Sequence, residues 1–270
     1  MGLDKLMDSI AETVVVRNLL TKLTDKCFEN GQTDMFFIAQ ERGFELSDLQ
    51  DSGLFLFTDD MLFTLIYNSI VGAEYRDKLA LIDSKGEFQH KCRTVFPVRD
   101  QMNNVMAWVS WQKHKQHKYL TSKTFGFEKS ACFYGMEYFD EILKKGYAII
   151  VEGMFDVVRW RSLGYYNVLG TMGNDLTLHK RMILNRIPVT IFCPDNDKGG
   201  RENSHKNKQS GFSDYRLWAT DKKFVRVELK GGYKDYDDYF KVETNREMAK
   251  IIIDTALQLK SGEVLSFETV

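Results

Sequence analysis

Apolar and polar residues follow two different patterns along this chain, one in each half. Residues 3–28 repeat apolar side chains at helical spacing, which predicts one or two amphipathic helices, and short helices are expected from 35 to 70. Residues 79–111 predict three short strands separated by turn-forming residues. Beyond about residue 135, apolar strands alternate with helical stretches, which is typical of a parallel α/β unit.

The change between these patterns predicts how the chain is divided. We expect a helical segment over 1–32, a mixed α/β subdomain over 33–140, a parallel-sheet domain over 141–245, and a helix with a tail over 246–270. The predicted fold class is therefore α/β, with an α+β subdomain followed by a parallel-sheet domain.

Carboxylates follow two of the predicted strands. The runs Ala148–Val151 and Val189–Phe192 are almost entirely apolar, as in parallel strands that are covered on both faces. Glu152 comes directly after the first run, and Asp195 and Asp197 come shortly after the second. Because open α/β sheets bind ligands at the carboxyl ends of their strands, these side chains are expected to meet there.

A third acidic group lies later in the chain, where Asp235 and Asp237 follow a Gly-Gly turn, and Asp156 lies one helical turn after Glu152. Hard cations such as Mg²⁺ bind a few carboxylates and keep positions for water and phosphate. Two such ions ~4 Å apart promote phosphoryl transfer. A single D-x-D is more commonly a helix cap or a turn, whereas three acidic segments in order favour a metal site.

Charge adds a second candidate surface. The net charge is only −1, but residues 1–84 carry a balance of −8 and residues 85–129 a balance of +6, with aromatic residues interleaved. A basic segment with aromatics is suited to binding phosphates and stacking bases, with Lys118 and Tyr119 as the best candidates. Arg93 and Arg99, six residues apart on one predicted strand, are expected to share a face. The same composition also describes a solvated, lysine-rich sheet surface, and charge alone leaves both interpretations open.

The cysteine content and the hydropathy of the chain indicate the cellular compartment. The four cysteines are scattered without a C-x-x-C pair, which argues against a structural zinc site or a disulfide framework and fits a reducing compartment. No apolar stretch is long enough to cross a bilayer, and the first residues lack the pattern of a signal peptide. We therefore expect a cytoplasmic protein, in a bacterial cell or a phage-infected host, with no membrane partner.

The acidic motifs, in this order, resemble the Toprim domain of DnaG-type primases and topoisomerases. VEGMFDVV is similar to the stretch that opens that domain, PDNDKGGR is similar to its D-G-D-R-A-G-R motif, and a D-x-D follows. Upstream, ERGF resembles the R-G-L element of the primases, and CRTVFPVRD resembles their R-x-x-F-P-I-R-D strand. KYLTS, followed by FGFEKSACFYGM, resembles a further primase stretch. The resemblance extends over roughly residues 33–241 and is closer to the primases.

The resemblance implies the RNA polymerase core of a primase, which joins ribonucleoside triphosphates on a single-stranded DNA template. It implies two or more Mg²⁺ or Mn²⁺ ions as cofactors. A replicative helicase, or a separate zinc-binding or helicase-interacting protein, is the implied partner. The implied catalytic residues are Glu152, Asp195 and Asp197. The implied metal ligands are these three together with Asp156, Asp235 and Asp237. The implied nucleotide and DNA contacts are Arg42, Arg93, Arg99, Lys118, Tyr119, Lys198 and Arg201.

Two other functions remain open. A Toprim nuclease would use the same carboxylates to cleave phosphodiesters, and an inactive Toprim module would serve only as a binding component of a replisome. The upstream motifs at Arg42, 93–99 and 118–119 favour the primase. The chain departs from the family pattern at Thr121, where Asn is common. It also lacks the zinc-ribbon cysteines and a G-G-R near residue 110.

Overall fold

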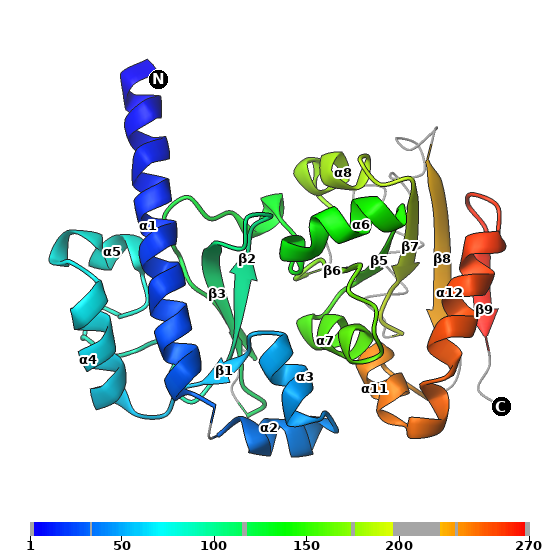
Figure 1. The fold of residues 1–270 in the computed structure, drawn as a ribbon, viewed down its shortest axis with the longest axis horizontal. Helices are drawn as coiled ribbons and strands as arrows, with labels where there is room; N and C mark the ends of the chain where they lie inside the picture. The colour runs from blue at the N-terminus through cyan, green and yellow to red at the C-terminus, as the bar shows by residue number, and fades with distance from the viewer. Residues whose placement is uncertain are drawn as a thin grey trace. The chain divides into compact units, whose positions relative to one another are not determined.

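The chain forms two compact units, Met1–Phe127 and Glu128–Val270 (Figure 1). The structure, a computed structural model, describes residues 3–32, 34–114, 118–173, 176–196, 222–229 and 232–267. The sequence pattern predicted a division between residues 140 and 141, whereas the units divide before Glu128. Residues 128–140 belong to the second unit because Phe133 and Phe139 lie in its core and Tyr134 pairs with Gly170.

The first unit packs helices against an antiparallel sheet. Its helices are α1 (Leu3–Asn30), α2 (Met35–Arg42), α3 (Leu46–Asp51), α4 (Asp60–Ile70) and α5 (Arg76–Leu79), with a 3-10 turn η1 (Ala73–Tyr75). Its strands are β1 (Phe55–Leu56), β2 (Thr94–Arg99), β3 (Val105–Trp111) and β4 (Tyr119–Thr121), in the order β1-β2-β3-β4. Of the three strands expected over 79–111, β2 and β3 form, while Ile82 and Phe88 make only an isolated bridge.

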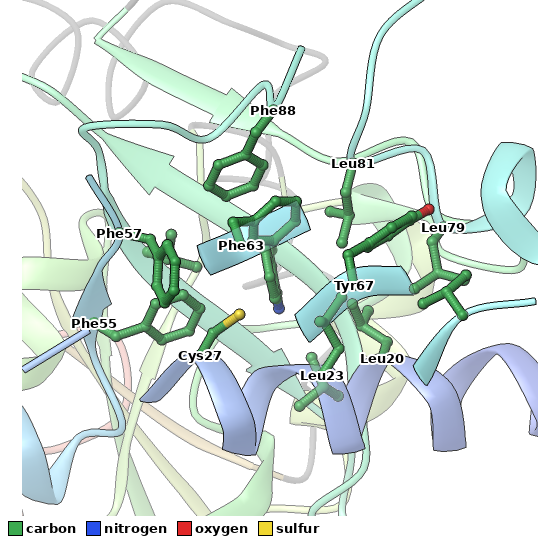
Figure 2. Close-up of a cluster of buried hydrophobic side chains, with 14 residues drawn as sticks. Leu20, Leu23, Cys27, Phe55, Phe57, Phe63, Tyr67, Leu79, Leu81 and Phe88 are labelled. Atoms are coloured by element: carbon green, nitrogen blue, oxygen red, sulfur yellow. The ribbon is translucent and has the colours of Figure 1, made fainter. Parts of the chain in front are cut away.

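An aromatic cluster forms the core of the first unit (Figure 2). It joins one face of α1 to α4 and to the sheet, and its members include Leu20, Leu23, Cys27, Phe63 and Tyr67. Phe63 stacks on Phe88 with ring centroids 3.7 Å apart. The buried indole N–H of Trp108 donates a hydrogen bond of 2.8 Å to Oγ1 of Thr24, so the polar atom of this ring is satisfied within the core.

The second unit is built on a parallel sheet. Its strands are β5 (Tyr147–Val151), β6 (Val168–Gly170), β7 (Val189–Cys193), β8 (Lys223–Leu229) and β9 (Val264–Phe267). Its helices are α6 (Phe139–Lys145), α7 (Met154–Ser162), α8 (Leu178–Leu184), α11 (Tyr236–Lys241) and α12 (Met248–Gln258), with 3-10 turns η2 (Lys129–Ala131), η3 (Met136–Tyr138) and η4 (Glu243–Asn245). Among the described residues the strand order is β6-β5-β7-β8-β9, and every neighbouring pair is parallel. The predicted α/β fold class is confirmed.

Helices cover both faces of the parallel sheet, which explains why its central strands are apolar on both sides. α6 and α8 share a core with Ile150 of β5 and Phe192 of β7. Cys193, the next residue of β7, points to the opposite face and lies beside Tyr236 of α11. On that face Trp160 of α7 packs against Phe240 of α11, with ring centroids 4.9 Å apart. In the described part of the chain, no helix combines the length and the hydropathy that crossing a membrane requires.

Candidate active site

The carboxyl edge of the parallel sheet brings two of the predicted acidic segments together. β5 and β7 are neighbours with Val151 opposite Cys193, so the loops that follow them begin side by side. Glu152 follows β5 directly, and its Oε1 accepts a hydrogen bond of 3.4 Å from the backbone N–H of Asp195, beyond β7. The glutamate is thus held against the backbone that carries the next carboxylate.

The third acidic segment is tied to the second by two hydrogen bonds from Asn196. Its backbone N–H donates to the carbonyl of Lys234 at 2.6 Å, and its side-chain amide donates to the carbonyl of Tyr233 at 3.1 Å. Asp235 then caps α11, because its Oδ1 accepts the N–H of Asp238 at 2.8 Å. Nζ of Lys234 lies 3.2 Å from the other oxygen of Asp235. Asp235 therefore has the capping role that a lone D-x-D commonly has. It also belongs to the carboxyl edge of the sheet that carries Glu152, Asp195 and Asp235, which we call the acidic edge.

A buried layer joins α7 to α11. Asp156 is 4% exposed, and its Oδ1 accepts the backbone N–H of Asp237 at 2.9 Å. The carboxylate of Asp237 accepts a hydrogen bond of 3.0 Å from Nε of Arg159. A Cβ atom at Gly153 would collide with the Asp156 carboxylate, so a glycine at this position leaves room for that side chain. Both aspartates are therefore engaged within the protein, and their predicted role as metal ligands stays a prediction.

Burial and crowding raise the pKa of Asp156 well above its ordinary value. Burial is the largest cause, and Asp195, Asp235 and Asp237 add to it because each repels the ionised form. Burial lowers the pKa of the Lys234 ammonium, but Asp235 and Asp195 outweigh it, so this pKa is raised. Negative charge is thus concentrated at the edge of the sheet. A hard cation would relieve it, and the oxygen donors fit such an ion.

Not every predicted site residue can be located. Asp197, Lys198 and Arg201 lie outside the described residues. Within the described ranges, no three Asp, Glu, His or Cys side chains form a group that could hold a metal ion. The carboxylates that can be located therefore converge on one edge without making a complete metal site among themselves.

Sequence reasoning missed two basic residues of this site. Arg159 lies three positions after Asp156 and so on the same side of α7, and that spacing was the available signal. Lys234 directly precedes Asp235, but sequence adjacency alone does not indicate that an ammonium approaches its neighbour's carboxylate. Both residues place positive charge next to the acidic groups.

In the first unit, four predicted nucleotide contacts converge at one end of the antiparallel sheet. Trp111, at the end of β3, pairs with Tyr119 of β4. The guanidinium of Arg42 lies over the Trp111 ring, 4.4 Å from its centroid, and Nη1 of Arg93 donates to the carbonyl of Lys118 at 3.2 Å. Lys118 and Tyr119 are exposed, whereas Arg93 is mostly buried, which lowers its pKa. The exposed members form a cationic and aromatic surface.

Arg99 lies at the other end of β2. It donates to the carbonyl of Asn103 at 3.0 Å and lies 3.9 Å from Asp25 of α1. Arg93 precedes the strand, and the register shifts between Val98 and Arg99. The expectation that the two arginines share a face depended on regular alternation through position 99, which this irregularity interrupts.

Comparison with known proteins gives sequence relatives among the primases. Residues 149–240 match a family model described as Toprim-like. The DNA primase of Aquifex aeolicus is 28% identical over 192 residues, which are 68% of this chain and 37% of that protein. The DNA primase of Rickettsia bellii is 36% identical over 116 residues, 40% of this chain and 19% of that protein. The chain thus spans well under half the length of these curated relatives.

Solved structures give the same result for the fold. The crystal structure of the zinc-binding and RNA polymerase domains of Aquifex aeolicus primase is similar with a TM-score of 0.75 and 22% identity, covering 90% of this chain and 61% of that chain. A DnaG primase catalytic domain bound to single-stranded DNA is similar with a TM-score of 0.72 and 18% identity, covering 89% and 80%. The chain is therefore similar in sequence to DNA primases, matches a Toprim-like family model over residues 149–240, and has the fold of the DnaG primase catalytic core.

Proposed function

We propose that this chain is the catalytic core of a DNA primase, which makes short RNA primers on single-stranded DNA from ribonucleoside triphosphates. The observation that carries the proposal is the meeting of three acidic segments at the carboxyl edge of a parallel sheet, in a homologue of DNA primases. One related catalytic domain was solved with single-stranded DNA, and the Mycobacterium tuberculosis RNA polymerase domain with a duplex carrying a 6-nucleotide overhang. Both support a DNA template. The enzyme would act in the cytoplasm, where template and nucleotides occur.

The acidic edge would hold the metal ions. Toprim primases are generally metal-dependent, and carboxylate oxygens are the ligands that Mg²⁺ and Mn²⁺ prefer. The side chains proposed to hold two or more such ions are Glu152, Asp195, Asp197 and Asp235. Asp156 and Asp237 would lie behind these ligands, in the buried layer between α7 and α11. When bound, the ions would neutralise the triphosphate and activate the attacking hydroxyl.

The chain's own residues would orient the reaction. Glu152 would position the 3′-hydroxyl of the growing primer and accept its proton. The 3′-oxygen forms a bond to the α-phosphorus of the incoming nucleotide while the bond from that phosphorus to the bridging oxygen breaks, and pyrophosphate leaves. Lys234, together with Lys198 and Arg201 from outside the described residues, would supply positive charge to the phosphates.

The cationic surface of the first unit would contact template or nucleotide. Lys118 would bind a phosphate, and Tyr119 would stack on a base. Arg42 and Arg93 support this surface through Trp111 and the Lys118 carbonyl, and Arg99 would act at a separate point. A replicative helicase, or a separate zinc-binding or helicase-interacting protein, is the partner we propose for template recognition.

A priming assay tests the proposal. Wild-type protein, incubated with single-stranded DNA, nucleoside triphosphates and Mg²⁺ or Mn²⁺, should make short RNA. Asp195→Asn should reduce synthesis by about 100-fold or more. Even the loss of a residue that only hydrogen-bonds to a metal ligand reduces activity by about 10- to 100-fold. Circular dichroism should give the same spectrum, and DNA affinity should be unchanged or tighter because a negative charge is removed. Normal synthesis by this folded variant would refute the site, and template degradation without nucleotides would identify a nuclease.

A further inference from the structure

A buried ion pair links the two helices that carry the acidic edge. Nε and Nη2 of Arg159, on α7, each lie 3.0 Å from Oδ1 of Asp237, on α11. The two side chains are 1% and 6% exposed. A charge pair is seldom buried for stability alone, because removing both ions from water offsets most of their attraction. We therefore expect the Arg159–Asp237 pair to have a role in addition to stabilising the fold.

The pair is one half of a double contact between α7 and α11. The other half is the hydrogen bond of 2.9 Å from the backbone N–H of Asp237 to Oδ1 of Asp156. Asp156 and Arg159 are three residues apart on α7, so they lie on the same side of it. The first turn of α11 is thus fixed to α7 at two points, once through its backbone and once through its side chain.

Both helices start at a carboxylate of the proposed site. α7 begins two residues after Glu152, and α11 begins directly after its cap Asp235. Because a helix is stiff over one turn, a contact that fixes the first turn of α11 against α7 also fixes Asp235 relative to Glu152. Loss of the contact at Arg159 would let the two carboxylates separate.

We infer that Arg159 is a positioning residue for primer synthesis, holding the Asp235 segment against the Glu152 segment, and that Asp237 is its anionic partner and not a metal ligand. This inference rests on the proposed function. The arginine also places a positive charge behind the carboxylates. Because Glu152 and Asp235 are both proposed metal ligands, its removal should weaken the binding of a divalent cation and also disturb the geometry needed for the reaction.

Arg161 provides a matched control on the same helix. It is also buried, at 5% exposure, and its Nη2 lies 3.0 Å from a carboxylate oxygen of Glu137. Its guanidinium lies over the ring of Tyr138 at 4.4 Å. Its partners belong to the η3 region and not to the acidic edge. Loss of Arg161 should therefore destabilise the second unit without moving the carboxylates.

The experiment compares Arg159→Met with Arg161→Met in the full chain. Primer synthesis is measured at saturating nucleotide and Mg²⁺ and corrected for the folded fraction by circular dichroism. Binding of Mn²⁺ is measured separately by electron paramagnetic resonance. We expect Arg159→Met to be about 10- to 100-fold slower than Arg161→Met, since a 1 Å misplacement costs about 100-fold. Its Mn²⁺ affinity should be lower than that of Arg161→Met, in which the two carboxylates keep their places. If Arg159→Met does not fold, the double variant Arg159→Met/Asp237→Asn is used in its place, because it leaves no unpaired charge in the core.

A second variant tests the role of Asp237. Asp237→Asn keeps an oxygen that accepts from Arg159, so it should bind as many Mn²⁺ ions as the wild type. Loss of one ion would show that Asp237 is a ligand and overturn that part of the inference. Equal rates for Arg159→Met and Arg161→Met, or equal Mn²⁺ affinities, would overturn the positioning role. Wild-type protein that makes no RNA would refute the proposed function first, and the positioning role with it.

Discussion

His90 makes the stability of the first unit sensitive to acid. Its side chain is fully buried, and its Nδ1 lies 2.8 Å from Oγ of Ser110. The rings of Phe88 and Trp108 lie 6.0 and 5.8 Å from it, centroid to centroid. Burial in this apolar core lowers the pKa of His90 to about 3, and the charge of Arg93 adds to the effect. The histidine is therefore neutral in the folded protein at any pH where the protein would be used.

The size and sign of the effect follow from linkage. The ordinary pKa of histidine is about 6.5, so below that pH the unfolded chain binds a proton that the folded chain does not bind. Folding stability is then complete above about pH 6.5 and falls as the pH decreases towards the folded pKa. Each pH unit costs about 1.4 kcal/mol, which gives about 2 kcal/mol between pH 6.5 and 5 and about 5 kcal/mol over the whole interval.

Urea unfolding of the wild type and of His90→Gln measures this contribution. Glutamine can still hydrogen-bond to Ser110 but does not titrate, and all other titrating groups are common to both proteins. Between about pH 8 and about pH 5, the wild type should lose about 2 kcal/mol more of its free energy of unfolding than the variant. If the two proteins show parallel pH dependence, His90 is not held neutral by burial and the reasoning is wrong.

Three further predictions concern the first unit. Lys118→Ala should weaken binding of labelled single-stranded DNA in fluorescence anisotropy and flatten its salt dependence by up to ~1 unit of slope, without loss of stability, because this side chain is exposed. Arg93→Ala should weaken binding and also lower the melting temperature, since Arg93 is mostly buried and holds the Lys118 carbonyl. If both variants bind single-stranded DNA with the salt dependence of the wild type, the basic segment 85–129 is only a solvated face. Thr24→Val should lower the free energy of unfolding by about 1–3 kcal/mol in urea titrations, because the indole N–H of Trp108 loses its partner in the core. An unchanged value would show that this hydrogen bond contributes nothing to stability.

The sequence alone was sufficient for the central strands of the parallel sheet and for the general position of the acidic residues. β5 and β7 are apolar almost throughout because helices cover both faces of their sheet, and this composition is visible without coordinates. Parallel strands also align their carboxyl ends. The proximity of Glu152 and Asp195 therefore followed from sequence order and strand type, and their contact agrees with it.

Other features depended on packing between distant segments. The division before Glu128 arises because residues 133–139 contribute to the core of the second unit, although their sequence has no strong periodic pattern. Arg93 and Arg99 lie at opposite ends of β2, and the register shifts between Val98 and Arg99. A register shift interrupts the alternation of faces and has no signature in the apolar pattern.

Asp235 and Asp237 show most clearly what each level of structure determines. In the sequence they are equivalent, two carboxylates after one turn, and the sequence determined that both lie near the carboxyl end of β8. In the structure Asp235 caps α11 at the acidic edge, while Asp237 is buried against Arg159, 78 positions earlier. A local pattern sets the spacing of side chains along an element. The partner of a buried charge depends on which helices pack together, so only the tertiary structure decided it.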